Sequence, residues 1–189
     1  MTFSAKLSAS PGGSSLIALT SNNNVLENEA EYQYLSQQLS LMYQQVNPTM
    51  DPYKIVKELQ SKRLPRLVIL MKDMSQTLGL SVRWLKVLGA TRQPCILLVS
   101  DTDSDSIGNN AAAHQALLHQ HGIPLVGILQ IGGIWNPIER RRDGLSWCGW
   151  WQGLQASSES KEILELETIY SIRKRWSQVI NDNLLETQN

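Results

Sequence analysis

The sequence is short of the residues on which several common protein classes depend. Two cysteines among 189 residues are too few for a disulfide framework. The 17 basic and 17 acidic residues cancel, so no overall field would draw the chain to DNA or to an anionic membrane. No apolar run approaches membrane-spanning length, and the first residues contain no apolar signal segment. These absences predict a soluble, cytoplasmic protein, in which any nucleic-acid role would need a local basic patch.

Phosphate-binding glycine loops are also missing. Neither the G-x-G-x-x-G spacing nor the Walker A pattern occurs in the chain. The glycine pair at 12–13 comes before the first apolar run, whereas a phosphate-cradling loop follows a strand and opens a helix. A nucleotide held by such a loop is therefore not expected.

A repeated pattern of strand and helix is present between residues 66 and 133. Three short apolar runs, Leu67–Met71, Cys95–Val99 and Leu125–Leu129, each begin one or two residues after a proline. Two segments of helical length separate them, and each ends at a glycine, Gly89 or Gly122. Continuous apolar runs are typical of strands buried on both faces, so the pattern predicts a β-α-β-α-β unit with a parallel sheet. Cys95 is expected to be a small buried hydrophobe in this sheet.

The whole chain is predicted to form a three-layer α/β sandwich, with a mainly parallel sheet of four to five strands and helices on both faces. Strands are expected at 15–20, 67–71, 95–100 and 125–131, with an edge strand at 146–151 that returns after a hairpin turn at Asp143-Gly144. Helices are expected at 27–46, 51–59, about 78–88, 109–121 and 159–180, the last with a buried stripe that includes Ile163 and Leu166. Residues 14–182 would form one domain, between a flexible arm at 1–13 and a frayed tail at 183–189.

An acidic loop follows the third predicted strand. Asp101, Asp103 and Asp105 alternate with other residues there, and three carboxylates beyond a parallel strand could bind Mg²⁺. Asp73 follows the strand at 67–71, and we expect that strand to lie beside the one at 95–100. Open α/β sheets place ligands at this carboxyl edge. The alternative is that these residues form local turns and helix N-caps.

Two family patterns resemble this loop. Leu97–Ser104 looks like the strand-D-x-D opening of haloacid-dehalogenase-type phosphohydrolases, which implies Asp101 as nucleophile and Asp103 as general acid. The chain departs from that pattern at Ser104, and no later acidic pair follows a strand. Asp103–Ala111 is similar to the D-x-D-x-x-G-x-x-A motif of Toprim domains, which also need a Glu-Gly pair after an upstream strand. This chain has Lys72-Asp73 there instead.

A second candidate site is the Trp/Arg segment, residues 134–153. It holds four of the six tryptophans and three consecutive arginines: Trp135, Trp147, Trp150, Trp151, Arg140, Arg141 and Arg142. Both residue types dominate binding hot spots. In a strand at 146–151, alternation would place Trp147 and Trp151 on one face and Trp150 on the other, leaving at least one indole near solvent. The alternative is that the tryptophans cap the core and the arginines stay solvated.

Two functions are compatible with these features. The first is a non-enzymatic binding or regulatory domain that engages a protein partner, a second copy of the chain or a ligand through the Trp/Arg segment. The second is a metal-dependent hydrolase, phosphoesterase-like or nuclease-like, that uses Asp101 and Asp103 with Asp73. We favour the first, because the second lacks a complementary acid and an evident base. No cofactor is expected except Mg²⁺ under the second hypothesis, a nucleic-acid partner is less favoured, and no membrane contact is expected.

Overall fold

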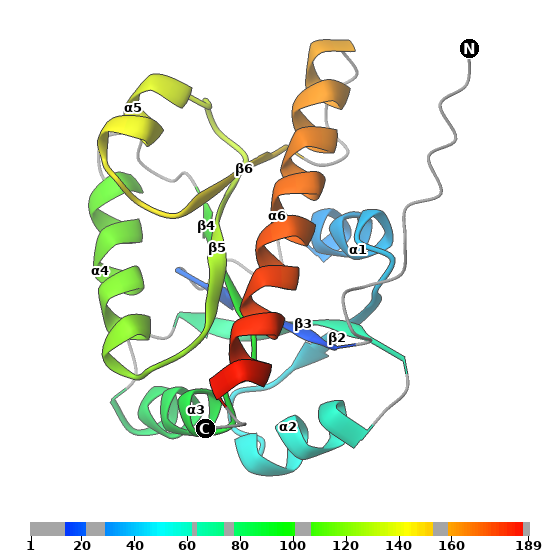
Figure 1. Cartoon of the computed structure of the whole chain (residues 1–189), viewed down its shortest axis with the longest axis vertical. Coiled ribbons are helices and arrows are strands. Elements are labelled where there is room, and N and C mark those ends of the chain that lie inside the picture. The colour runs from blue at the N-terminus through cyan, green and yellow to red at the C-terminus, as the bar shows by residue number, and fades with distance from the viewer. Residues whose placement is uncertain are drawn as a thin grey trace.

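The computed structural model describes residues 14–21, 29–61, 64–73, 78–100, 107–152 and 159–186 (Figure 1). Six strands form one all-parallel sheet in the order β2-β3-β1-β4-β5-β6. The strands are β1 Leu16–Thr20, β2 Met42–Val46, β3 Arg66–Asp73, β4 Cys95–Ser100, β5 Leu125–Ile131 and β6 Trp147–Trp151. The helices are α1 Glu29–Gln38, α2 Pro52–Ser61, α3 Leu78–Ala90, α4 Ile107–Gln120, α5 Pro137–Arg142 and α6 Glu159–Glu186. The predicted α/β class with helices on both faces is confirmed.

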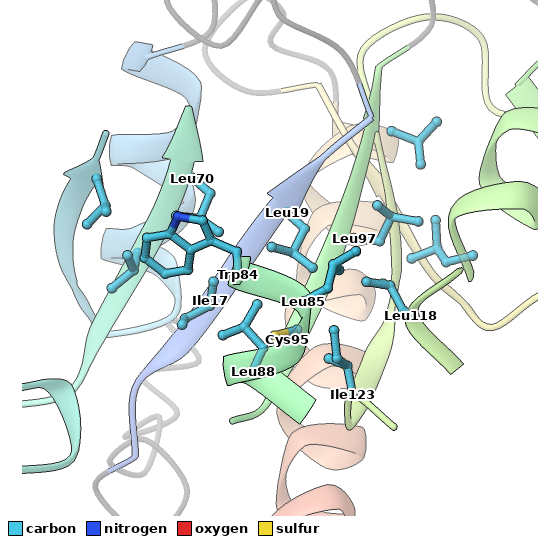
Figure 2. Packing of buried hydrophobic residues seen from close by; sticks show 14 of the residues in the cluster. Ile17, Leu19, Leu70, Trp84, Leu85, Leu88, Cys95, Leu97, Leu118 and Ile123 are labelled. Carbon is cyan, nitrogen blue, oxygen red and sulfur yellow. The ribbon is translucent and has the colours of Figure 1, made fainter. Parts of the chain in front are cut away.

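Two hydrophobic clusters cover the two faces of the sheet. Alternate residues of β1 divide between them, with Ile17 and Leu19 on one face and Leu16 and Ala18 on the other, as the twofold repeat of a strand requires. Helices α2, α3 and α4 cover the first face, where Figure 2 shows Trp84, Leu88 and Leu118 packed against the strands. Helices α1 and α6 cover the second face through Tyr32, Leu35, Ile172 and Trp176. Cys95 is fully buried in the first cluster, as predicted.

The strand count differs from the prediction because β2 was taken for helix. The helix expected at 27–46 ends at Gln38, and Ser40 adopts a left-handed φ of 59° that turns the chain. The next five residues, Met42–Val46, pair in parallel with β3 at the edge of the sheet. A serine in this conformation carries no glycine or proline signal, and the apolar residues around it continue the helical spacing. The sheet therefore has six strands and not four to five.

The expected pairing of the strands at 67–71 and 95–100 is wrong. Strand β1 lies between β3 and β4 and pairs in parallel with both. Neighbouring strands are about 4.8 Å apart, so the ends of β3 and β4 are separated by about 10 Å. They still lie at the same carboxyl edge, because all strands run in one direction.

The Trp/Arg segment forms a helix and a parallel strand, and not the expected hairpin. Asn136 caps α5 by accepting hydrogen bonds from the backbone N–H groups of Ile138 and Glu139, with Pro137 in the first turn. Helix α5 then carries the chain back, so that β6 pairs with β5 in parallel. The predicted turn at Asp143-Gly144 follows α5 and does not join two antiparallel strands.

A register shift in the pairing of β6 with β5 changes the face of the sheet on which the β6 tryptophans lie. Ile128 pairs with Trp147 and Leu129 pairs with Gly149, so Cys148 is an extra residue opposite β5. Trp147 consequently packs in the cluster under α2, α3 and α4, whereas Trp151 packs in the cluster under α1 and α6. The prediction that both would share one face is wrong, because it assumed unbroken alternation.

Helix α6 is longer, and exposes more apolar surface, than the sequence predicted. It continues past 182 to Glu186, and the Asn183 side chain exchanges two hydrogen bonds of 3.0 Å with Arg92. Ile163 and Leu166, expected in the buried stripe, are 58% and 59% exposed, because the buried contacts begin at Thr168 and Ile169. Within the described ranges, no helix is long and apolar enough to cross a bilayer.

Candidate functional site

The acidic residues of the hydrolase hypothesis fall outside what the structure describes. Asp101, Asp103 and Asp105 belong to the undescribed stretch 101–106, and Asp73 ends β3 with its side chain undescribed. Among the described residues, no three His, Cys, Asp or Glu side chains are grouped so that they could hold a metal ion. The hydrolase hypothesis therefore stays a prediction.

The residues of the Trp/Arg segment divide between the interior and the surface. Trp147, Trp150 and Trp151 are buried, and Trp135 is partly buried. Arg140 is also buried, at 9% exposure, whereas Arg141 and Arg142 are exposed. All three tryptophans of β6 are buried, so the expectation that this strand leaves an indole near solvent is wrong. The alternative in which all three arginines stay solvated is wrong for Arg140.

Arg140 is held by three neighbours. Its Nε donates to Gln130 Oε1 at 3.3 Å, and its Nη1 lies 3.6 Å from Asp143 Oδ2. The guanidinium carbon also lies 4.9 Å from the centre of the Trp147 ring, in cation-π geometry. The Trp147 indole N–H in turn donates to both oxygens of Asp143, at 3.0 and 2.9 Å. Every member of this group is paired, which is the condition for a buried charge to be tolerated.

Gln130 extends the same network into the loop between β5 and α5. Its side-chain amide donates to the carbonyl oxygens of Gly132 and Ile134, each at 3.1 Å. The Trp150 indole N–H donates to the same Gly132 carbonyl at 2.8 Å. Gly132 and Gly133 have φ values of 69° and 64°, a conformation that favours glycine. The network fixes the loop that leads into α5.

Sequence reasoning missed Gln130, which is fully buried. A signal for it was present, because it is the one polar residue in the run Leu125–Ile131. A lone glutamine in a buried strand needs hydrogen-bond partners, and the adjacent Gly132-Gly133 turn supplies a carbonyl.

The start of α4 lies against this cluster. A side chain added at Gly108 would come within 3.8 Å of Arg140 Nη1 and 3.9 Å of Asp143 Oδ2. Helix α4 begins at Ile107, directly after the undescribed residues 101–106. The amino-terminal end of α4 is therefore a neighbour of the Arg140 cluster.

Four exposed side chains form what we call the α5 ridge: Ile134, Ile138, Arg141 and Arg142. Ile134 is 82% exposed and Ile138 is 61% exposed. Trp135 lies partly buried at the base of the ridge, with its ring edge-to-face against Trp147 at 6.1 Å between centroids. The ridge thus combines two exposed isoleucines with two exposed arginines, next to a tryptophan that packs on Trp147.

The open edge of β6 is covered in part by α6. The Trp150 N–H donates to Thr168 Oγ1, and the same hydroxyl donates to the Trp150 carbonyl, both at 3.2 Å. Gly149 makes this approach possible, because a Cβ there would lie 2.2 Å from Thr168 Oγ1. The backbone of Trp150 is consequently not available for an added strand.

Neither cysteine is suited to nucleophilic chemistry at neutral pH. Burial raises the pKa of the Cys148 thiol to about 11, although Arg175 and a hydrogen bond from Ser171 partly oppose the shift. Burial also raises the pKa of the Cys95 thiol. Because the thiolate is the reactive form, both act as packing residues.

A search against protein-family models finds none that matches the chain, and no curated protein matches it either.

Proposed function

We propose that this protein is a non-enzymatic binding domain that docks a protein partner through the α5 ridge. One observation carries the proposal. Ile134 and Ile138 are mostly exposed although they stand on a loop and helix held in place by Arg140, Gln130 and Asn136. A fixed backbone lowers the entropy that binding would cost, and exposed apolar side chains gain from being covered.

The chemistry of the ridge indicates the kind of partner. Arg141 and Arg142 lie exposed on the same short helix as Ile138. An apolar socket with an acidic rim would complement this combination, because isoleucines contribute burial and arginines contribute charge-assisted hydrogen bonds. A partner that adds a strand to β6 is less favoured, since the Trp150 N–H and carbonyl groups already form hydrogen bonds with the Thr168 hydroxyl. The partner is therefore expected to contact helix α5 and the loop before it.

Site-specific photo-crosslinking tests the proposal in the cells that produce the protein. A photo-reactive residue at Ile138, which is 61% exposed, is compared with one at Tyr53 on α2, which is 59% exposed. The proposal predicts a discrete crosslinked protein from position 138 and none of the same size from position 53. Equal yields from the two positions, or no discrete product from 138, would contradict it.

Charge reversal sharpens the same experiment. Arg141→Glu with Arg142→Glu should reduce the product from position 138 at least about tenfold, since like charges across an interface cost several kcal/mol. Lys54→Glu with Lys57→Glu on α2 makes the same charge change at exposed positions and should leave the product unchanged. A product that is a dimer of this chain would identify the partner as a second copy.

The hydrolase hypothesis has its own measurement. Mg²⁺-dependent cleavage of a generic phosphodiester, abolished by Asp101→Asn with Asp103→Asn, would replace the binding proposal with an enzymatic one.

A further inference from the structure

The two edge strands of the sheet differ in how their outer backbone groups are satisfied. At the β6 edge, the Thr168 hydroxyl bonds to both the N–H and the carbonyl of Trp150. Strand β2, at the opposite edge, pairs with β3 alone, and no described residue bonds to the backbone on its outer side. Strand β2 also contains no charged residue, proline or register shift, three of the devices with which natural edge strands avoid pairing. The β2 edge is therefore open to another strand.

The register of β2 against β3 identifies the free backbone groups. The Met42 N–H donates to the Pro65 carbonyl at 3.1 Å, at the start of the ladder with β3. Successive residues of a strand direct their backbone groups to opposite sides, so Gln44 also faces β3, while Tyr43 and Gln45 face outward. Each of these two outward residues offers one N–H and one carbonyl.

We propose that β2 pairs antiparallel with β2 of a second copy of this chain, with a twofold axis at Gln44. In this register Tyr43 of each copy lies opposite Gln45 of the other, and every outward N–H and carbonyl of the two residues is paired. The two sheets become one continuous sheet. A closed contact between identical surfaces is the commonest form of assembly among soluble proteins.

Two properties of this edge favour a second copy as the partner. Strand β2 is uncharged, so two copies bring no like charges together across the axis. Exposed apolar side chains lie toward both ends of the strand, with Met42 and Leu64 at the amino end and Met50 beyond the carboxyl end. An antiparallel pair brings the amino end of one strand to the carboxyl end of the other. The contact therefore covers apolar side chains with apolar side chains on both sides of the axis.

The proposed contact is separate from the α5 ridge. Strands β2 and β6 form opposite edges of the sheet, and the ridge lies on the loop and helix that lead into β6. The inference therefore does not depend on the proposed docking function, and one molecule can make both contacts.

Disulfide trapping tests the register of the pairing. Both natural cysteines are buried, so Gln44→Cys supplies the accessible thiol. Residues directly opposite each other at the axis have Cα atoms about 4.5 Å apart, which a disulfide can span. In a glutathione redox buffer, Gln44→Cys should form a covalent dimer at least about tenfold faster than Met42→Cys, because the two copies of position 42 would lie about 14 Å apart. Met42 is more exposed than Gln44, so random collision predicts the opposite order, and that order would overturn the proposal.

Sedimentation equilibrium measures the pairing without a crosslink. The mass of the natural chain should rise from that of one copy toward that of two between about 1 and 200 μM. Gln45→Pro removes an outward N–H while leaving the ladder with β3 intact, and should weaken pairing at least about tenfold.

A second variant keeps the test valid if the proline disturbs the fold. Met42→Lys places a charge in the contact from an exposed position and should also weaken pairing, whereas Tyr170→Lys makes the same type of change on α6 and should have little effect. A monomer at every concentration, or equal weakening by Met42→Lys and Tyr170→Lys, would overturn the proposal.

Discussion

Arg140 and Arg141 are adjacent in the sequence and have opposite surroundings. Arg140 is buried against Trp147, Gln130 and Asp143, whereas Arg141 is exposed beside Ile138. One residue of an α-helix turns the side chain by about 100°, and this rotation separates the two arginines. The residues of the Trp/Arg segment therefore fall into two sets. One set is buried and stabilises the fold, and the other is exposed to solvent.

The tryptophans of the segment show the same division. Trp147 is buried with its N–H satisfied by Asp143, whereas Trp135 is only partly buried and meets the Trp147 ring edge-to-face. The tryptophan and arginine content of the segment predicted a binding surface. Which of its residues are available to bind is decided by the packing of β6 and α5.

The largest effect is expected when the tryptophans are truncated in turn. Trp147→Ala should lower the free energy of unfolding by about 3 to 5 kcal/mol, because it leaves a cavity and removes one of the partners of Arg140 and one of the partners of Asp143. Trp135→Ala should cost less than half as much, since that ring is only partly buried and no charged residue depends on it. Urea unfolding measures both. Equal losses would contradict the division of the segment.

The pH dependence of the free energy of unfolding tests whether Cys148 in β6 is buried. The pKa of the Cys148 thiol is raised from an ordinary value of 9.0 to about 11 in the folded protein. Between these values the unfolded chain loses the proton and the folded chain keeps it, so stability is full below pH 9 and falls as pH rises toward 11.

The expected size of this loss is about 2 kcal/mol, and it should be absent in Cys148→Ala. Other groups titrate in the same range and cancel when the two proteins are compared. An identical pH profile for the two would show that Cys148 is not buried as described.

Much of the fold could be predicted because the sheet is built from strong local signals. Apolar runs and prolines marked β3, β4 and β5. Of the two glycines expected to end helices, Gly122 follows α4 with a left-handed φ of 65°, whereas Gly89 lies inside α3, which continues to Ala90. Strand β2 was missed because Ser40 makes a turn with a residue that has no special preference for it. Strand β6 was predicted at nearly the right residues but in the wrong direction, because helix α5 before it was not predicted. That helix is only six residues long, and its one sequence signal is the capping residue Asn136 followed by proline.

The candidate site was harder to predict because it depends on contacts between distant parts of the chain. The extra residue at Cys148 follows from pairing with β5, and no sequence pattern within β6 reveals it. The packing of Tyr34 against Trp151 joins α1 to β6, which are more than a hundred residues apart in the sequence. The helical spacing of Ile163 and Leu166 predicted that both are buried, but they are exposed, because the buried contacts of α6 with β6 begin only at Thr168.

The most direct test of the division within the segment is urea unfolding of Arg140→Met beside Arg141→Met. The two variants remove the same charge from neighbouring positions and keep a long apolar side chain. We predict that Arg140→Met loses about 1 to 2 kcal/mol of stability, because Gln130 Oε1 and Asp143 lose a buried donor, while Arg141→Met changes by less than about 0.5 kcal/mol. Equal losses in the two variants, or a larger loss in Arg141→Met, would contradict the account.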